Sequence, residues 1–101
     1  MISGLIQSFT FELPSEMGGE ISNAIVVFAQ DGVDILVKKM EDLTINKDLL
    51  YLTLSQEETG EFSEGVLRMQ LQIETNNGRQ YASEILQTIV QGTLGGVVIG
   101  Q

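Results

Sequence analysis

The 101-residue sequence lacks the side chains that most often carry chemistry, since it has no histidine, no cysteine and no tryptophan. Without cysteine, the chain can form neither a disulfide framework nor a thiolate metal site. Without histidine, its serine and threonine hydroxyls lack the usual general base, and a hydroxyl without a base is a poor nucleophile. These absences predict a protein that is not an enzyme and that uses no cofactor.

Basic residues are also scarce, because five lysines and arginines stand against 14 acidic residues and give a formal charge of −9. Binding to a phosphate backbone needs clustered cations, and the one basic pair is Lys38-Lys39. Anionic membrane surfaces are disfavoured for the same reason. No apolar run reaches the roughly 18 residues of a membrane span, and the N-terminus lacks the pattern of a signal sequence. We therefore expect neither a nucleic-acid partner nor a membrane partner.

The acidic residues gather in loops, most densely between Glu57 and Glu64. Paired carboxylates can bind Ca²⁺ or perform acid–base chemistry. The alternating acids and central glycine of an EF-hand loop are absent, and glutamates in a loop are typical of solvated surface. The glycine pairs Gly18-Gly19 and Gly95-Gly96 match neither a P-loop nor a dinucleotide-binding motif. The sequence therefore predicts no metal site.

Alternation of apolar and polar residues is the strongest structural signal, and it runs from Val66 to Glu74. A period of two marks a half-buried strand. Asn77-Gly78 then predicts a tight hairpin with positive φ angles, and a return strand is expected from Arg79 to about Val90. In that return strand we expect one face to carry Tyr81, Ile85 and Ile89, and the other Ala82, Leu86 and Val90.

Other segments extend this β pattern. The alternating run that ends at Leu13 and the leucines at positions 50, 52 and 54 each predict a strand with one buried face. Residues 24–29 are apolar on both faces, which is typical of a central strand with both sides covered, whether by a second sheet or by a partner. Asp31-Gly32 predicts a second hairpin. Ser55 and Glu58 match a capping box and predict one turn of helix.

These patterns predict an all-β fold, namely an antiparallel immunoglobulin-like β-sandwich of six to seven strands with one short helical turn. We expect a single domain over residues 1–101, with an apolar N-terminal segment (1–7) and a glycine-rich apolar C-terminal tail (92–101). Such a tail suits either a last edge strand or docking into a neighbouring subunit. The residues that we expect to bind partners are Met1, Ile2, Leu5, Ile6, Val97, Val98 and Ile99.

The order of several short motifs resembles small structural proteins of phages and prophages of Gram-positive bacteria. The motifs are Phe9-Thr10-Phe11-Glu12-Leu13-Pro14, the run 24–30, Leu52 to Thr59, Phe62-Ser63-Glu64-Gly65 and Tyr81 to Ile85. The pattern is also similar to the immunoglobulin-like N-terminal domain of phage baseplate upper proteins. The resemblance implies a virion protein assembled in the bacterial cytoplasm. It implies no catalytic residues, and we expect no fibre or receptor-binding extension.

From the residues and the resemblance together, we expect a non-enzymatic virion structural or accessory protein, either a capsid decoration protein or a head–tail or tail adaptor. Its partners would be other virion proteins and copies of itself, joined through edge strands and termini. The alternative is a soluble module that binds carbohydrate or that mediates Ca²⁺-dependent adhesion. Sugar sites favour exposed aromatic platforms, and this chain offers only Tyr51 and Tyr81 as amphipathic aromatics.

Overall fold

A computed structural model of the chain describes residues 1–14, 20–83 and 85–92. These residues form eight β-strands, one short α-helix and one 3-10 turn. The strands are β1 (Gln7–Glu12), β2 (Ile21–Gln30), β3 (Val33–Lys39), β4 (Thr44–Asn46), β5 (Leu49–Leu54), β6 (Gly65–Thr75), β7 (Gln80–Ala82) and β8 (Leu86–Val90). The 3-10 turn η1 (Met40–Asp42) precedes β4, and the helix α1 (Gln56–Gly60) precedes β6. None of the described helices is long and apolar enough to cross a membrane.

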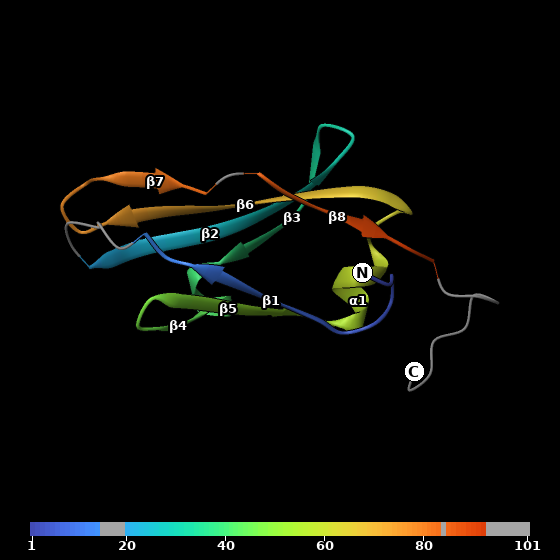
Figure 1. The fold of residues 1–101 in the computed structure, drawn as a ribbon, viewed down its shortest axis with the longest axis horizontal. Helices are drawn as coiled ribbons and strands as arrows, with labels where there is room; N and C mark the ends of the chain where they lie inside the picture. The colour runs from blue at the N-terminus through green and yellow to red at the C-terminus, as the bar shows by residue number, and fades with distance from the viewer. Residues whose placement is uncertain (15–19, 84, 93–101) are drawn as a thin grey trace.

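The strands pair into two antiparallel sheets that lie one above the other (Figure 1). One sheet has the order β1-β5-β4, and the other has the order β3-β2-β6, with β7 and β8 pairing in succession along the far side of β6. In immunoglobulin terms these are strands B-E-D and C′-C-F-G. The connectivity confirms the predicted immunoglobulin-like sandwich. Among the described residues there are eight strands rather than six or seven, and none takes the position of strand A beside β1.

The core fills the space between the sheets with the side chains that the alternation predicted. Four alternating apolar residues of β6 are buried, as are the three leucines of β5. Phe28 of β2 is fully buried, and its ring centroid lies 5.8 Å from the rings of both Phe9 and Phe62. In antibody domains a tryptophan on the equivalent strand packs on a disulfide between the sheets. Here three phenylalanines join the sheets without any cysteine.

The two predicted hairpin turns differ in geometry. Asp31 and Gly32 both have positive φ angles, 52° and 78°, as a two-residue type I′ turn requires. In the second hairpin only Gly78 does, with φ 83°, and its N–H donates to the Thr75 carbonyl over 3.0 Å. That turn is therefore a three-residue loop, 76–78, that ends at a glycine, and the prediction of positive φ at Asn77 is wrong. Within this loop the Asn76 N–H donates to the Glu20 carbonyl.

The return strand of this hairpin is interrupted, which the sequence pattern did not indicate. Between β7 and β8 the Ser83 N–H donates to the Leu71 carbonyl, and the Leu71 N–H donates to the Ser83 hydroxyl. The irregularity shifts the alternation by one residue. Tyr81 therefore faces inward opposite Ile73, whereas Ile89 faces outward opposite Val66. The predicted faces of residues 81–90 are thus correct within each short strand but wrong across the interruption.

The capping box at α1 is confirmed. The Glu58 N–H donates to the Ser55 hydroxyl over 3.1 Å, and the Ser55 N–H donates to the Glu58 carboxylate over 2.9 Å. The same carboxylate accepts a hydrogen bond of 2.7 Å from Lys38 of β3. Partial burial alone would raise the pKa of Glu58, but the bonds from Lys38 and Ser55 outweigh it and lower that pKa. This ion pair joins the five-stranded sheet to the connection between the sheets.

Candidate interaction surface

The outward sides of the two sheets differ in composition, and we call them the five-strand face and the three-strand face. Residues that lie opposite each other in a sheet project to the same side, so the register assigns each face. The apolar residues of the five-strand face include Ile25 and Val27, both half-buried. Four more are well exposed: Ile85 (58%), Ile89 (54%), Val66 (46%) and Val37 (42%). This density of exposed aliphatic side chains points to a contact surface.

Glutamines supply most of the uncharged polar groups on the described strands of the five-strand face. Gln70 and Gln72 stand opposite Val27 and Ile25 on the neighbouring strand. The Gln72 side-chain amide donates to the Gln70 side chain over 3.4 Å, and the Gln70 amide donates to the Ser83 carbonyl over 3.0 Å. Because an uncharged amide loses less solvation than a carboxylate or ammonium group, such a row can be buried against a partner at modest cost.

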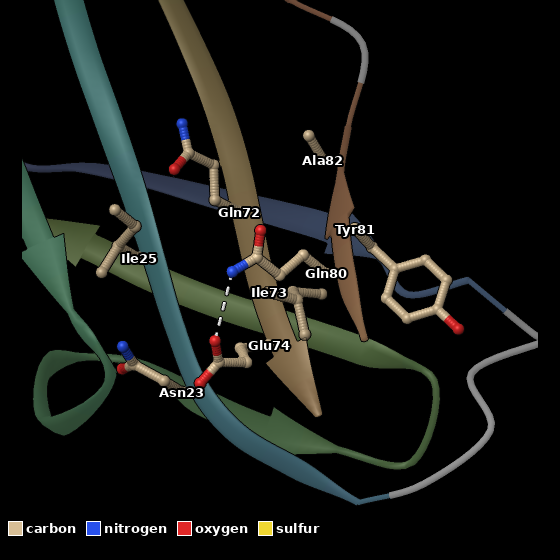
Figure 2. A pocket seen from close by; sticks show the side chains of 8 residues that line it. All are labelled: Asn23, Ile25, Gln72, Ile73, Glu74, Gln80, Tyr81 and Ala82. Atoms are coloured by element: carbon tan, nitrogen blue, oxygen red, sulfur yellow. Dashed lines mark hydrogen bonds between the residues drawn. The ribbon is translucent and has the colours of Figure 1, made fainter. Parts of the chain in front are cut away.

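The face is hollowed at three places along its length. One depression of about 310 Å³ lies where β2, β6 and β7 run together, and Figure 2 shows Gln72, Glu74 and Gln80 around it. The Gln80 amide donates to the Glu74 carboxylate over 3.2 Å. A second depression of about 300 Å³ lies between Val27, Gln70 and Ile85, and a third of about 440 Å³ lies beside Arg68. The surface is therefore uneven, as a surface that receives side chains of a partner would be.

The charges on the described strands of the five-strand face balance. Among the described strand residues, the outward-facing charged side chains are Asp34, Lys39, Arg68 and Glu74, two acids and two bases, while Asp31 of the β2–β3 turn borders the third depression. Most of the acidic excess of the chain, whose formal charge is −9, therefore lies outside these strands. A neutral face is suited to a neutral partner surface and shows no complementarity to a basic one.

The three-strand face has the opposite character. Its outward residues on β1 are Ser8, Thr10 and Glu12, and those on β5 include Tyr51 and Thr53. The hydroxyls of Ser8 and Thr53 lie 3.0 Å apart and share a hydrogen bond. Short hydroxylated side chains interact well with water, so this face is a solvated surface.

The N-terminal residues predicted to bind partners are held partly within the molecule. The terminal amino group of Met1 donates to the Ile89 carbonyl, and its side chain packs on the core. Ile2 forms a parallel bridge with Gln91. Leu5 is half-buried, and its carbonyl accepts a hydrogen bond from buried Thr59. Ile2 and Ile6 keep exposed side chains. Val97, Val98 and Ile99 lie outside the described residues.

The sequence analysis did not name the five-strand face, although one signal pointed to it. Residues 24–29 are apolar on both faces, yet the structure covers only the side of Val26 and Phe28 with a second sheet. The other side, with Ile25 and Val27, has no layer above it among the described residues. The prediction that both sides of this strand are covered is therefore met on one side only within the described residues.

Features needed for the alternative binding functions are dispersed. Tyr51 lies on the three-strand face, whereas Tyr81 faces the core from the other sheet, so the two do not form one aromatic platform. Within residues 1–14, 20–83 and 85–92, no group of three or more acidic side chains is placed to hold a metal ion.

Few known proteins resemble this chain in sequence or in fold. No protein-family model matches the sequence. No curated protein matches it either. Among solved structures, the V domain of amphioxus IgVJ-C2 is similar, with 16% identity, coverage of 88% of this chain and 95% of that chain, and a TM-score of 0.34. The phage resemblance of the sequence stays a prediction.

Proposed function

We propose that this protein is a non-enzymatic structural module that assembles with copies of itself through the five-strand face. The observation that carries the proposal is the combination, on one face, of exposed aliphatic residues with balanced charge on a strongly acidic chain. Most of the surface of such a chain repels a second copy. The five-strand face is the part where two copies can meet without that repulsion.

The size of the face is adequate for a weak to moderate dimer. β2 has 10 residues and β6 has 11, so the central strands are about 33–36 Å long. Four strand positions span about 19 Å, which gives a face of roughly 600 Å². Standard interfaces bury about 800 Å² on each partner, and weaker ones bury about 600 Å². A dimer with a contact of this size would form at high protein concentration and dissociate into monomers on dilution.

The biological setting that we propose is a bacteriophage virion, in which the protein would be a decoration or adaptor component. The support for this setting is the motif order of the sequence, together with the lack of histidine and cysteine chemistry. Mass spectrometry of particles purified from the bacterium that carries this sequence would test it. Peptides of the chain at a fixed ratio to the major particle proteins are expected, and their absence from intact particles would reject the virion setting.

The self-assembly itself is tested by a pair of isosteric charge changes. Gln72→Glu places a carboxylate on the five-strand face, and Asn46→Asp places one on β4 of the other sheet. Sedimentation or light scattering over a range of concentrations should show a reversible dimer for the unaltered chain. We expect Gln72→Glu to weaken that dimer by at least about tenfold, and Asn46→Asp to leave it unchanged.

Salt gives an independent reading of the same proposal. Because two chains of charge −9 repel each other across a neutral contact, raising the ionic strength should strengthen the dimer. Binding of the acidic chain to a basic partner would instead weaken as the ionic strength is raised. A chain that stays monomeric at all concentrations and salt levels, or a dimer equally sensitive to both variants, would show that the five-strand face is not a self-assembly surface.

A further inference from the structure

Among the described residues, one long side of the sandwich is left open, and it is the side bordered by β1 and β8. The edges of β3 and β4 share the opposite side, because η1 joins these two strands directly. The edges of β1 and of β7 and β8 therefore share the other side. The bridge between Ile2 and Gln91 agrees with this, since it ties the segment leading into β1 to the end of β8. We call this side the open edge.

Inward-facing apolar side chains are incompletely covered at the open edge. Leu86 pairs with buried Met69 and so points between the sheets, yet it is 43% exposed. Phe9 of β1 and Tyr81 of β7 also point inward, and both are only half-buried. Inward residues in the middle of the same sheets, such as Leu71 and Leu50, are buried almost completely. One additional strand at the open edge would therefore cover these exposed inward side chains.

The backbone of β1 also has an unpaired side at the open edge. Within the described residues β1 pairs with β5 on one side and with no strand on the other, which is where strand A lies in an immunoglobulin domain. An edge strand of six residues presents unpaired N–H and C=O groups that readily accept another strand. The site would thus bind an extended, apolar, uncharged peptide segment.

The chain itself contains a segment of that chemistry. Residues 93–101 carry no charged side chain on a chain of −9, and they include Val97, Val98 and Ile99, which favour extended structure. They follow Gly92, next to the Gln91 that bonds with Met1 and Ser3 beside the open edge. Nine extended residues span about 30 Å, and β1 is about 20 Å long. The segment is therefore longer than β1 and could pair along it.

We propose that the open edge is a strand-binding site and that residues 94–99 of the same chain occupy it as an added strand beside β1. Covalent attachment gives this segment a high effective concentration at the site, which favours the same chain over a second copy. The added strand covers Leu86 and Phe9 and leaves the five-strand face free for assembly. This inference stands apart from the proposed function, because either can fail alone.

A spin label tests the inference in the full-length chain. The protein has no cysteine, so Gln101→Cys provides a unique attachment site for a nitroxide. In the labelled, isotopically enriched chain we expect the amide signals of β1 and of Leu86 to broaden, and to recover when the label is reduced. The amides near Val33, which begins β3 directly after the Asp31-Gly32 turn, are the internal control and should keep their intensity.

Two further samples decide the occupant. In a mixture of spin-labelled chains without isotope and isotope-enriched chains without label, the β1 signals should stay sharp; broadening in that mixture would assign the site to a second copy and overturn the proposal. Changing Val97, Val98 and Ile99 together to serine should restore the β1 signals in the labelled chain. Unbroadened β1 signals in the original labelled chain, with a folded spectrum, would show that the segment does not bind the open edge.

Discussion

The two outward faces of this sandwich share one core but differ in what they present to the solvent. The three-strand face displays hydroxyls such as Ser8, Thr10 and Thr53, whereas the five-strand face displays aliphatic residues and glutamines. Both are built from alternating strands over the same buried layer. The difference shows that the outward half of each alternation carries functional information, while the inward half serves the fold. Three predictions test this division, beginning with the largest expected effect.

Two neighbouring residues of β2, one facing inward and one outward, should differ most in their effect on stability. Phe28→Ala removes the ring that joins the sheets and is expected to lower the free energy of unfolding by about 3–5 kcal/mol, measured by urea denaturation. Val27→Ala, one position away on the five-strand face, should cost less than about 1.5 kcal/mol at a protein concentration where the chain is monomeric. Equal losses for the two variants would mean that the five-strand face is a structural layer and not a contact surface.

The connection between the sheets should affect stability without affecting assembly. Ser55→Ala removes the hydroxyl that accepts from the Glu58 N–H at the start of α1, and it is expected to cost about 1 kcal/mol. Because α1 does not belong to the five-strand face, the dissociation constant of the dimer should not change. Thermal unfolding and sedimentation on the same samples measure the two quantities. A weaker dimer with unchanged stability would contradict the separation of roles.

The smallest effect concerns the ion pair of Glu58 with Lys38. The folded-state pKa of Glu58 is lowered, so its contribution to stability is complete above the ordinary glutamate pKa of about 4.3 and is lost as the pH falls through the folded value. Glu58→Gln keeps a side chain that suits the capping box. Near neutral pH it should cost less than about 1 kcal/mol, because the pair is partly exposed.

Denaturation at several pH values provides the check on this pair. The difference between the unaltered chain and Glu58→Gln should shrink as the pH is lowered below about 4. A difference that is constant with pH would show that the ion pair contributes nothing and that the variant acts on the cap alone.

Much of the fold could be predicted because its signals are local. The alternation along β6 predicted which of its residues are buried, and the Ser55–Glu58 spacing predicted the start of α1. The interruption between β7 and β8 could not be predicted in this way. It depends on hydrogen bonds between Ser83 and Leu71, which are 12 residues apart in the chain and adjacent only in the sheet.

The candidate surface follows the same division. The sequence by itself determined that the chain is acidic, lacks histidine and cysteine, and has one strand, residues 24–29, that is apolar on both sides. Only the tertiary structure decided which side of that strand stays uncovered, and it placed Val37, Val66 and Ile89 from three other strands on the same face of the sheet. Alternation fixes the two faces of a strand. Which face meets the second sheet depends on long-range pairing, and the neighbours that complete a surface come from distant parts of the chain.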